Sequence, residues 1–115
     1  MYKFYYNEVL DESPKEAREQ ERTALERSIA LLQEAEKKGA QSREAVEAIF
    51  FVRKLWGIFI EDLSKAENGL PQQLRADLVS VGLWVMRETE EIRHGRSSNF
   101  AALIDVSKTI SEGLK

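Results

Sequence analysis

The residues that could do chemistry are few, and the sharpest of them form a Glu-x-x-His spacing. Glu91 and His94 stand three positions apart, so on a helix their side chains would lie one turn apart and could share a metal ion. Di-iron helical bundles use this spacing, but they need it twice. His94 is the only histidine of the chain, so we expect no metal site. Its position before Gly95 fits the negative end of a helix dipole instead.

Other kinds of catalysis find equally little support. The acidic clusters are Glu61 with Asp62, and Glu88 with Glu90 and Glu91. We expect them to form solvated faces, because nothing in the sequence marks a polar cleft that would perturb their carboxyl groups. The chain has no cysteine, no Gly-x-Ser-x-Gly elbow and no glycine-rich phosphate loop. We therefore predict a protein that is not an enzyme, with no catalytic residue, no cofactor and no small-molecule substrate.

The composition describes one helical domain. At 115 residues the chain fits a single domain, residues 1–115, that can bury a core without disulfides or metals. A formal net charge of −3 gives no long-range attraction for nucleic acid or anionic lipid, which argues against direct RNA binding. The longest apolar runs are far shorter than the roughly 20 residues that a bilayer needs, and the start does not resemble a signal peptide. We expect a cytoplasmic protein without membrane insertion.

Capping signals divide the chain into four helices joined by short connections. The predicted boundaries are Ser13 and Pro14 to Gly39, Ser42 to Asn68 and Gly69, Pro71 to His94 and Gly95, and Ser97 or Ser98 to Leu114. Short connections favour antiparallel neighbours, and the single modest apolar face of the first helix predicts an outer position. The aromatic residues 2–6 could be extended or form a further turn of helix. The fold class predicted is all-α: a compact, four-helix bundle-like single domain with an aromatic N-terminal segment.

The two middle helices carry more apolar surface than one buried stripe needs. With about 100° per residue, the core face of the first comprises Ala45, Ala48, Ile49, Val52, Leu55, Trp56, Phe59 and Leu63. Its shoulders are Val46 with Phe50 on one side and Phe51 with Ile58 on the other. The second has a stripe of Leu74, Leu78, Val81, Val85 and Ile92, a separate row of Val79, Leu83 and Met86, and Trp84 to one side. Helices of this kind are central in a domain or receive a partner.

Two glycines lie inside these middle helices. Gly57 and Gly82 each cost roughly 1 kcal/mol relative to alanine, so we expect them where the two helices approach closely. Trp56 lies on the main stripe and is expected in the core. For Trp84, both the core and an interface remain open.

Two long stretches together cover nearly the whole chain: EQERTALERSIALLQEAEKKGAQSREAVEAIFFVRKLWGIFIEDL and ENGLPQQLRADLVSVGLWVMRETEEIRHGRSSNFAALIDVSKTISEGL. They resemble the FlaF family, flagellar proteins of alphaproteobacteria, and the resemblance runs from Tyr2 to Leu114. It implies a flagellin-binding chaperone that promotes flagellin synthesis or export and acts opposite FlbT, a repressor of flagellin translation. The alternative is a post-transcriptional regulator of flagellin that acts through FlbT or the flagellin messenger RNA.

The resemblance supplies no catalytic motif and no binding residue, so the predicted site rests on the surplus apolar rows. Flagellin terminal segments become amphipathic helices in the filament, and a groove with anchors one and two turns apart would hold such a helix. The predicted partner-binding residues are Phe50, Phe51, Ile58, Val79, Leu83, Trp84 and Met86. A homodimer formed through the same surface is the structural alternative.

Overall fold

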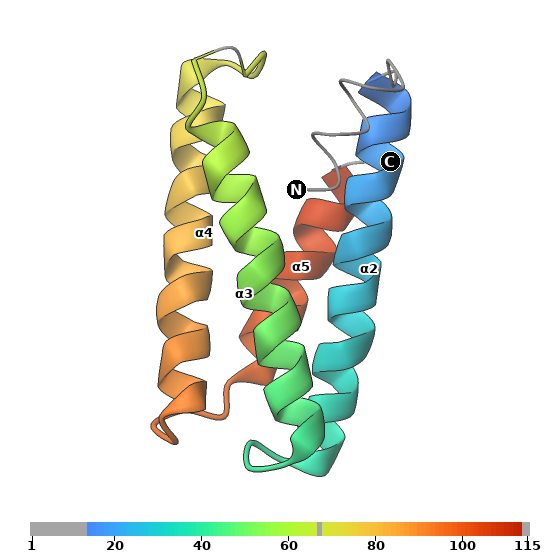
Figure 1. The fold of residues 1–115 in the computed structure, drawn as a ribbon, viewed down its shortest axis with the longest axis vertical. Helices are drawn as coiled ribbons and strands as arrows, with labels where there is room; N and C mark the ends of the chain where they lie inside the picture. Colours follow the sequence, from blue (N-terminus) through green and yellow to red (C-terminus); the bar gives the residue numbers. More distant parts are fainter. Residues whose placement is uncertain (1–13, 67, 114–115) are drawn as a thin grey trace.

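The computed structural model describes residues 14–66 and 68–113 (Figure 1). Four helices follow one another: α2 (Pro14–Lys38), α3 (Arg43–Leu63), α4 (Gln72–Arg93) and α5 (Phe100–Gly113). They confirm the prediction of an all-α, four-helix arrangement. Ser13, the aromatic residues 2–6 and Leu114 lie outside the described residues, so what was predicted for them stays a prediction.

Several predicted helix ends are confirmed because one residue determines each of them. The Ser42 hydroxyl oxygen accepts a hydrogen bond from the backbone N–H of Ala45 at 3.0 Å, which caps α3. Gly39 and Gly95 follow α2 and α4 with φ of 98° and 76°, the left-handed conformation that glycine adopts most easily. Pro71 immediately precedes α4.

The predicted end of α3 at Asn68 and Gly69 is wrong, because the helix stops at Leu63. Ser64 is its C-cap: its hydroxyl donates to the carbonyl oxygen of Ile60 at 2.8 Å, and the next backbone N–H, that of Lys65, donates to the Asp62 carbonyl at 3.3 Å, three residues back and not four. A serine that bonds the preceding turn competes with continuation of the helix. Of the described glycines, Gly39 and Gly95 have a positive φ, but Gly69 does not. Gly69 therefore does not have the left-handed conformation that was expected of it as a helix end.

The predicted cap of α5 is also wrong. Neither Ser97 nor Ser98 caps the helix, since the side-chain oxygen of Asn99 accepts from the backbone N–H of Ala102 at 3.2 Å. Ser97 takes a different role: its hydroxyl donates to a Glu88 carboxylate oxygen at 2.7 Å and accepts from the Asn99 N–H at 3.1 Å. Ser97 therefore links the segment between α4 and α5 to α4, and it helps to position Asn99, which caps α5.

The helices do not all pack on the neighbours that precede and follow them in the chain, as the short connections had predicted. α2 packs on both α3 and α5, and α3 also packs on α4 (Figure 1). The prediction of an outer first helix is thus wrong. Its buried face consists of Leu25, Ser28, Leu32 and Ala35. Small side chains let neighbours approach α2 closely, and the Ser28 hydroxyl is satisfied inside the helix, donating to the Leu25 carbonyl at 2.7 Å. Among the described elements, α4 has one principal neighbour, α3, and α5 has one, α2.

Trp56 anchors the core. Its side chain is 2% exposed, and its ring meets Phe59 edge to face with ring centroids 5.3 Å apart. The surrounding cluster draws on all four helices and includes Leu32, Ala48, Val52, Val85, Ile92, Phe100 and Leu103. The prediction that Trp56 belongs to the core is confirmed. Trp84 is half-buried and packs against the edge of this cluster.

The two internal glycines lie where α3 and α4 meet, which confirms their predicted packing role. A Cβ atom added to Gly82 would lie 2.8 Å from Cγ1 of Ile60 and 3.1 Å from the Trp56 ring. A Cβ on Gly57 would lie 3.8 Å from the terminal carbon of Met86. A methyl group at Gly82 would therefore force Ile60 or the Trp56 ring to shift, whereas the position of Gly57 has room for one.

This difference predicts opposite effects of the same substitution. Gly82→Ala should lower the free energy of unfolding by about 1 kcal/mol, since overpacking against the buried Trp56 ring outweighs the gain in helix propensity. Gly57→Ala should be neutral or raise it by up to about 1 kcal/mol, because the methyl group makes only ordinary contact. Urea unfolding followed by circular dichroism measures both. Equal stabilisation by the two variants would contradict this account.

Candidate partner-binding groove

One face of the α3–α4 pair stays uncovered because α4 packs principally on α3. On α3, Val46 and Phe50 stand one turn apart and are 68% and 69% exposed. On α4, Leu83 is 49% exposed, and Met86 and Val79 are half-buried. Single exposed apolar side chains are common on protein surfaces, but these follow rows of helical spacing on neighbouring helices.

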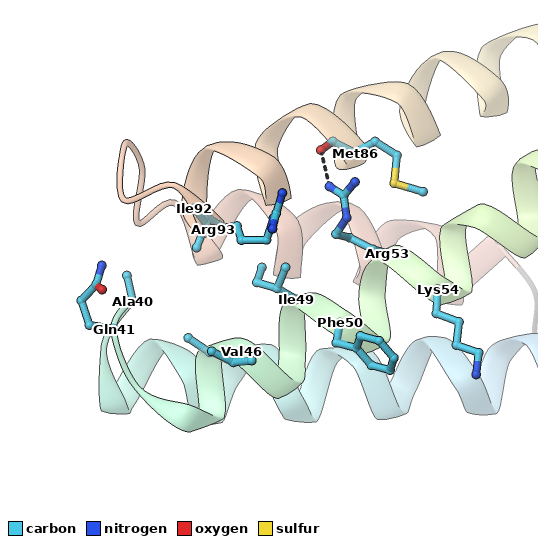
Figure 2. A pocket seen from close by; sticks show the side chains of 11 residues that line it. Ala40, Gln41, Val46, Ile49, Phe50, Arg53, Lys54, Met86, Ile92 and Arg93 are labelled. Atoms are coloured by element: carbon cyan, nitrogen blue, oxygen red, sulfur yellow. Dashed lines mark hydrogen bonds between the residues drawn. The ribbon is translucent and has the colours of Figure 1, made fainter.

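Several of these side chains line one hollow, which we call the α3–α4 groove. It has a volume of about 620 Å³ and is lined by Ala40, Gln41, Ala45, Val46, Ile49, Phe50, Arg53, Lys54, Met86, Ile92 and Arg93. Figure 2 shows Val46 and Phe50 on α3, with Met86 and Arg93 across from them on α4. The floor is apolar and fixed, because Ile49 and Ile92 belong to the buried core.

Arg53 joins the two helices beneath the groove. Its Nη1 donates to the Met86 carbonyl oxygen at 2.9 Å and to the Thr89 hydroxyl oxygen at 3.0 Å (Figure 2 draws the former). Thr89 is fully buried, and its hydroxyl in turn donates to the Val85 carbonyl at 2.8 Å. A guanidinium with several fixed partners holds the spacing of the two helices, so the groove is largely preformed.

An ion-pair cluster borders the groove on α4. Oε2 of Glu90 lies 2.8 Å from Arg93 and 2.7 Å from His94, and Oε1 lies 3.4 Å from Arg53. Hydrogen bonds from Arg93 and His94 lower the pKa of Glu90 from 4.5 to about 2. Glu91 pairs separately with Arg96 at 2.7 Å, so Glu91 and His94 do not converge on one point. Within the described residues, no group of three or more His, Asp or Glu side chains could hold a metal ion.

Comparison with known proteins gives one decisive match. The family of the flagellar protein FlaF matches residues 2–114, nearly the whole chain. The chain belongs to the FlaF family. As a FlaF protein it has a role in flagellum biosynthesis. No curated protein and no solved structure matches it. Of the helices that the structure describes, none has the length and apolar character needed to cross a membrane.

The groove of this FlaF protein brings together only part of the predicted site. Phe50 and Met86 line it, and Leu83 and Val79 continue the Met86 row along α4 at helical spacing. Val46 also lines the groove. Val46 lies on the same shoulder of the helix as Phe50, and this spacing could have identified it as a binding residue.

The remaining predicted residues lie elsewhere. Phe51 faces α2, where it lines a separate shallow hollow with Gln20 and Ala24. Ile58 is only 7% exposed and offers almost no accessible surface. Trp84 packs against the core. The predicted residues also do not include Arg53, which lies three residues after Phe50 and lines the groove.

The Glu90 cluster makes stability depend on pH in a defined direction. A carboxyl group whose pKa is lower in the folded protein stabilises it above the unfolded pKa, and this contribution disappears as pH falls through the folded value. The thermal midpoint should therefore drop between about pH 4.5 and about pH 2. Glu90→Gln, which cannot ionise, should drop less over the same interval. Identical slopes for the two proteins in circular dichroism melts would show that Glu90 contributes nothing.

Proposed function

We propose that this FlaF protein is a flagellin-binding chaperone and regulator, not an enzyme, which promotes flagellin synthesis and secretion. It would act by holding a terminal segment of flagellin in the α3–α4 groove. The observation that supports this most is the pair Val46 and Phe50. Each is about two-thirds exposed, although both belong to α3, which has more buried residues than any other described helix.

The physical argument rests on the match between anchor spacing and a helical client. An amphipathic helix presents apolar side chains at intervals of three and four residues, and grooves of this kind bind it through those anchors. Burying one large apolar side chain contributes about 2 kcal/mol before ordering costs. Four contacts, at Val46, Phe50, Leu83 and Met86, would contribute about 8 kcal/mol on that basis, enough to hold a segment that orders on binding.

The test is a calorimetric titration of the purified protein with monomeric flagellin and with flagellin lacking each terminal helix. Saturable binding that disappears with one terminus would support the chaperone and locate its client segment. Absence of heat with every form would refute it. Binding to FlbT or to the flagellin 5′ leader, with none to flagellin, would favour the regulatory alternative. Light scattering on the same sample tests a homodimer formed through the groove.

A further inference from the structure

We infer that the α3–α4 groove selects a helix whose apolar face is bordered by carboxylate side chains. The inference concerns the groove of the proposed function and in that sense rests on it. It adds the charge pattern of the partner, which the apolar contacts alone leave open.

The polar lining of the groove is cationic in an acidic protein. The chain carries a formal net charge of −3, yet Arg53, Lys54 and Arg93 line the groove and no acidic side chain does. Glu90 stands beside it, and its carboxylate is already bound by Arg93 and His94. The groove thus combines Val46 and Phe50, the two most exposed large apolar side chains among the described residues, with charged lining residues that are all cationic.

Lys54 is the most available of these charges. It follows Phe50 by one turn of α3, is exposed, and forms no ion pair with any residue that the structure describes. Arg93 extends from α4 on the opposite side (Figure 2), and more than half of its side chain remains exposed while it binds Glu90. Each side of the groove therefore offers one accessible cation near the apolar surface.

A bound helix would bring its own border residues to these two cations. When its apolar stripe rests on Val46, Phe50 and Met86, the residues that flank the stripe lie near Lys54 on one side and Arg93 on the other. Carboxylates at those positions would gain two rim ion pairs, whereas lysines would be repelled. Such rim pairs contribute modestly to affinity but strongly to the choice of partner.

Two designed peptides provide the test. Each is an amphipathic helix of about 18 residues, or five turns, with the same leucine face; one has glutamates along its borders and the other lysines. We expect the glutamate peptide to bind at least about tenfold more tightly at low ionic strength, as two exposed pairs gained against two repulsions allow. The preference should shrink at about 1 M salt, where screening is nearly complete. The net charge of the protein favours the opposite order, so non-specific attraction cannot produce this result.

Two variants of equal charge change show whether the groove causes the preference. Lys54→Glu should reduce the ratio of the two affinities about fivefold or more, through loss of one pair and gain of one repulsion. Lys108→Glu makes the same change on an exposed position of α5, outside the groove, and should leave the ratio nearly unchanged. Equal effects of the two variants, equal or tighter binding of the lysine peptide, or no binding of either peptide would each overturn the inference.

The proposed function can fail separately. If flagellin does not bind while the glutamate peptide shows the expected preference, the charge selection stands and the client is a different protein. In the opposite case, flagellin binds through Val46 and Phe50, but salt and Lys54→Glu change neither its affinity nor the ratio of the two peptide affinities. That result would support the chaperone function and refute the charge selection.

Discussion

Replacing Val46 and Phe50 together by lysine is expected to abolish flagellin binding while leaving the helical circular dichroism unchanged. Each side chain is more than two-thirds exposed, so neither contributes to the core. Loss of two buried contacts removes about 4 kcal/mol of binding free energy, equivalent to about a thousandfold in affinity. Calorimetric titration with monomeric flagellin measures the effect.

A matched control is available on α4. Leu74 is 42% exposed and does not line the groove, so Leu74→Lys should leave affinity within about twofold, as expected for a side chain outside the contact. Leu83→Lys, on the row that extends the groove, should weaken binding to an intermediate degree. Full affinity in the double variant would refute the groove as the binding site, and loss of helical signal would assign these side chains to the fold.

The fold was predictable where one residue determines a local structure. Ser42 as a cap and Gly39 and Gly95 as helix ends follow from short-range hydrogen bonding and from backbone freedom. The end of α3 was missed because Asn68 and Gly69 gave a stronger turn signal than Ser64. Ser64 is nevertheless the C-cap, and its hydroxyl donates to the Ile60 carbonyl oxygen.

The arrangement of the helices was less predictable, because it depends on contacts distant in sequence. α2 looked peripheral since its apolar stripe is narrow, yet Ser28 and Ala35 are small enough to bring neighbours close on two sides. Helical periodicity places a residue on a shoulder but does not say which neighbour covers that shoulder. For this reason the sequence predicts Phe50 and Phe51 equally as binding residues. In the structure their environments differ: Phe50 is exposed, whereas Phe51 packs beside α2.

The charged lining of the groove could not be predicted from the sequence for a related reason. Neither Lys54 nor Arg53 is among the predicted site residues, because that prediction follows the apolar rows of the two middle helices. Only the antiparallel pairing of α3 and α4 brings Arg53 to the Met86 carbonyl and the Thr89 hydroxyl. The charge of the groove therefore comes from two helices, with Arg53 and Lys54 on α3 and Arg93 on α4.

Trp56→Ala should lower the free energy of unfolding of the whole domain by about 3–5 kcal/mol. The ring is almost completely buried, packs against Phe59, and lies where Gly82 of α4 approaches α3. The surrounding helices cannot close the resulting cavity fully. Since domains of this kind have about 5–15 kcal/mol of stability in total, the variant should unfold at a much lower urea concentration.

Trp84→Ala makes the same change of side chain at a less buried position and serves as the comparison for Trp56→Ala. Because Trp84 is half-buried at the edge of the core, its loss should cost about 1–2 kcal/mol, roughly in proportion to the smaller area that it buries. Urea titration monitored by circular dichroism measures both variants without relying on tryptophan fluorescence, which each substitution alters. Equal losses would mean that α4 is held as firmly as the centre of the bundle. A larger loss for Trp56→Ala, accompanied by weaker flagellin binding, would show that the exposed groove depends on the packing of α3 against α4 beneath it.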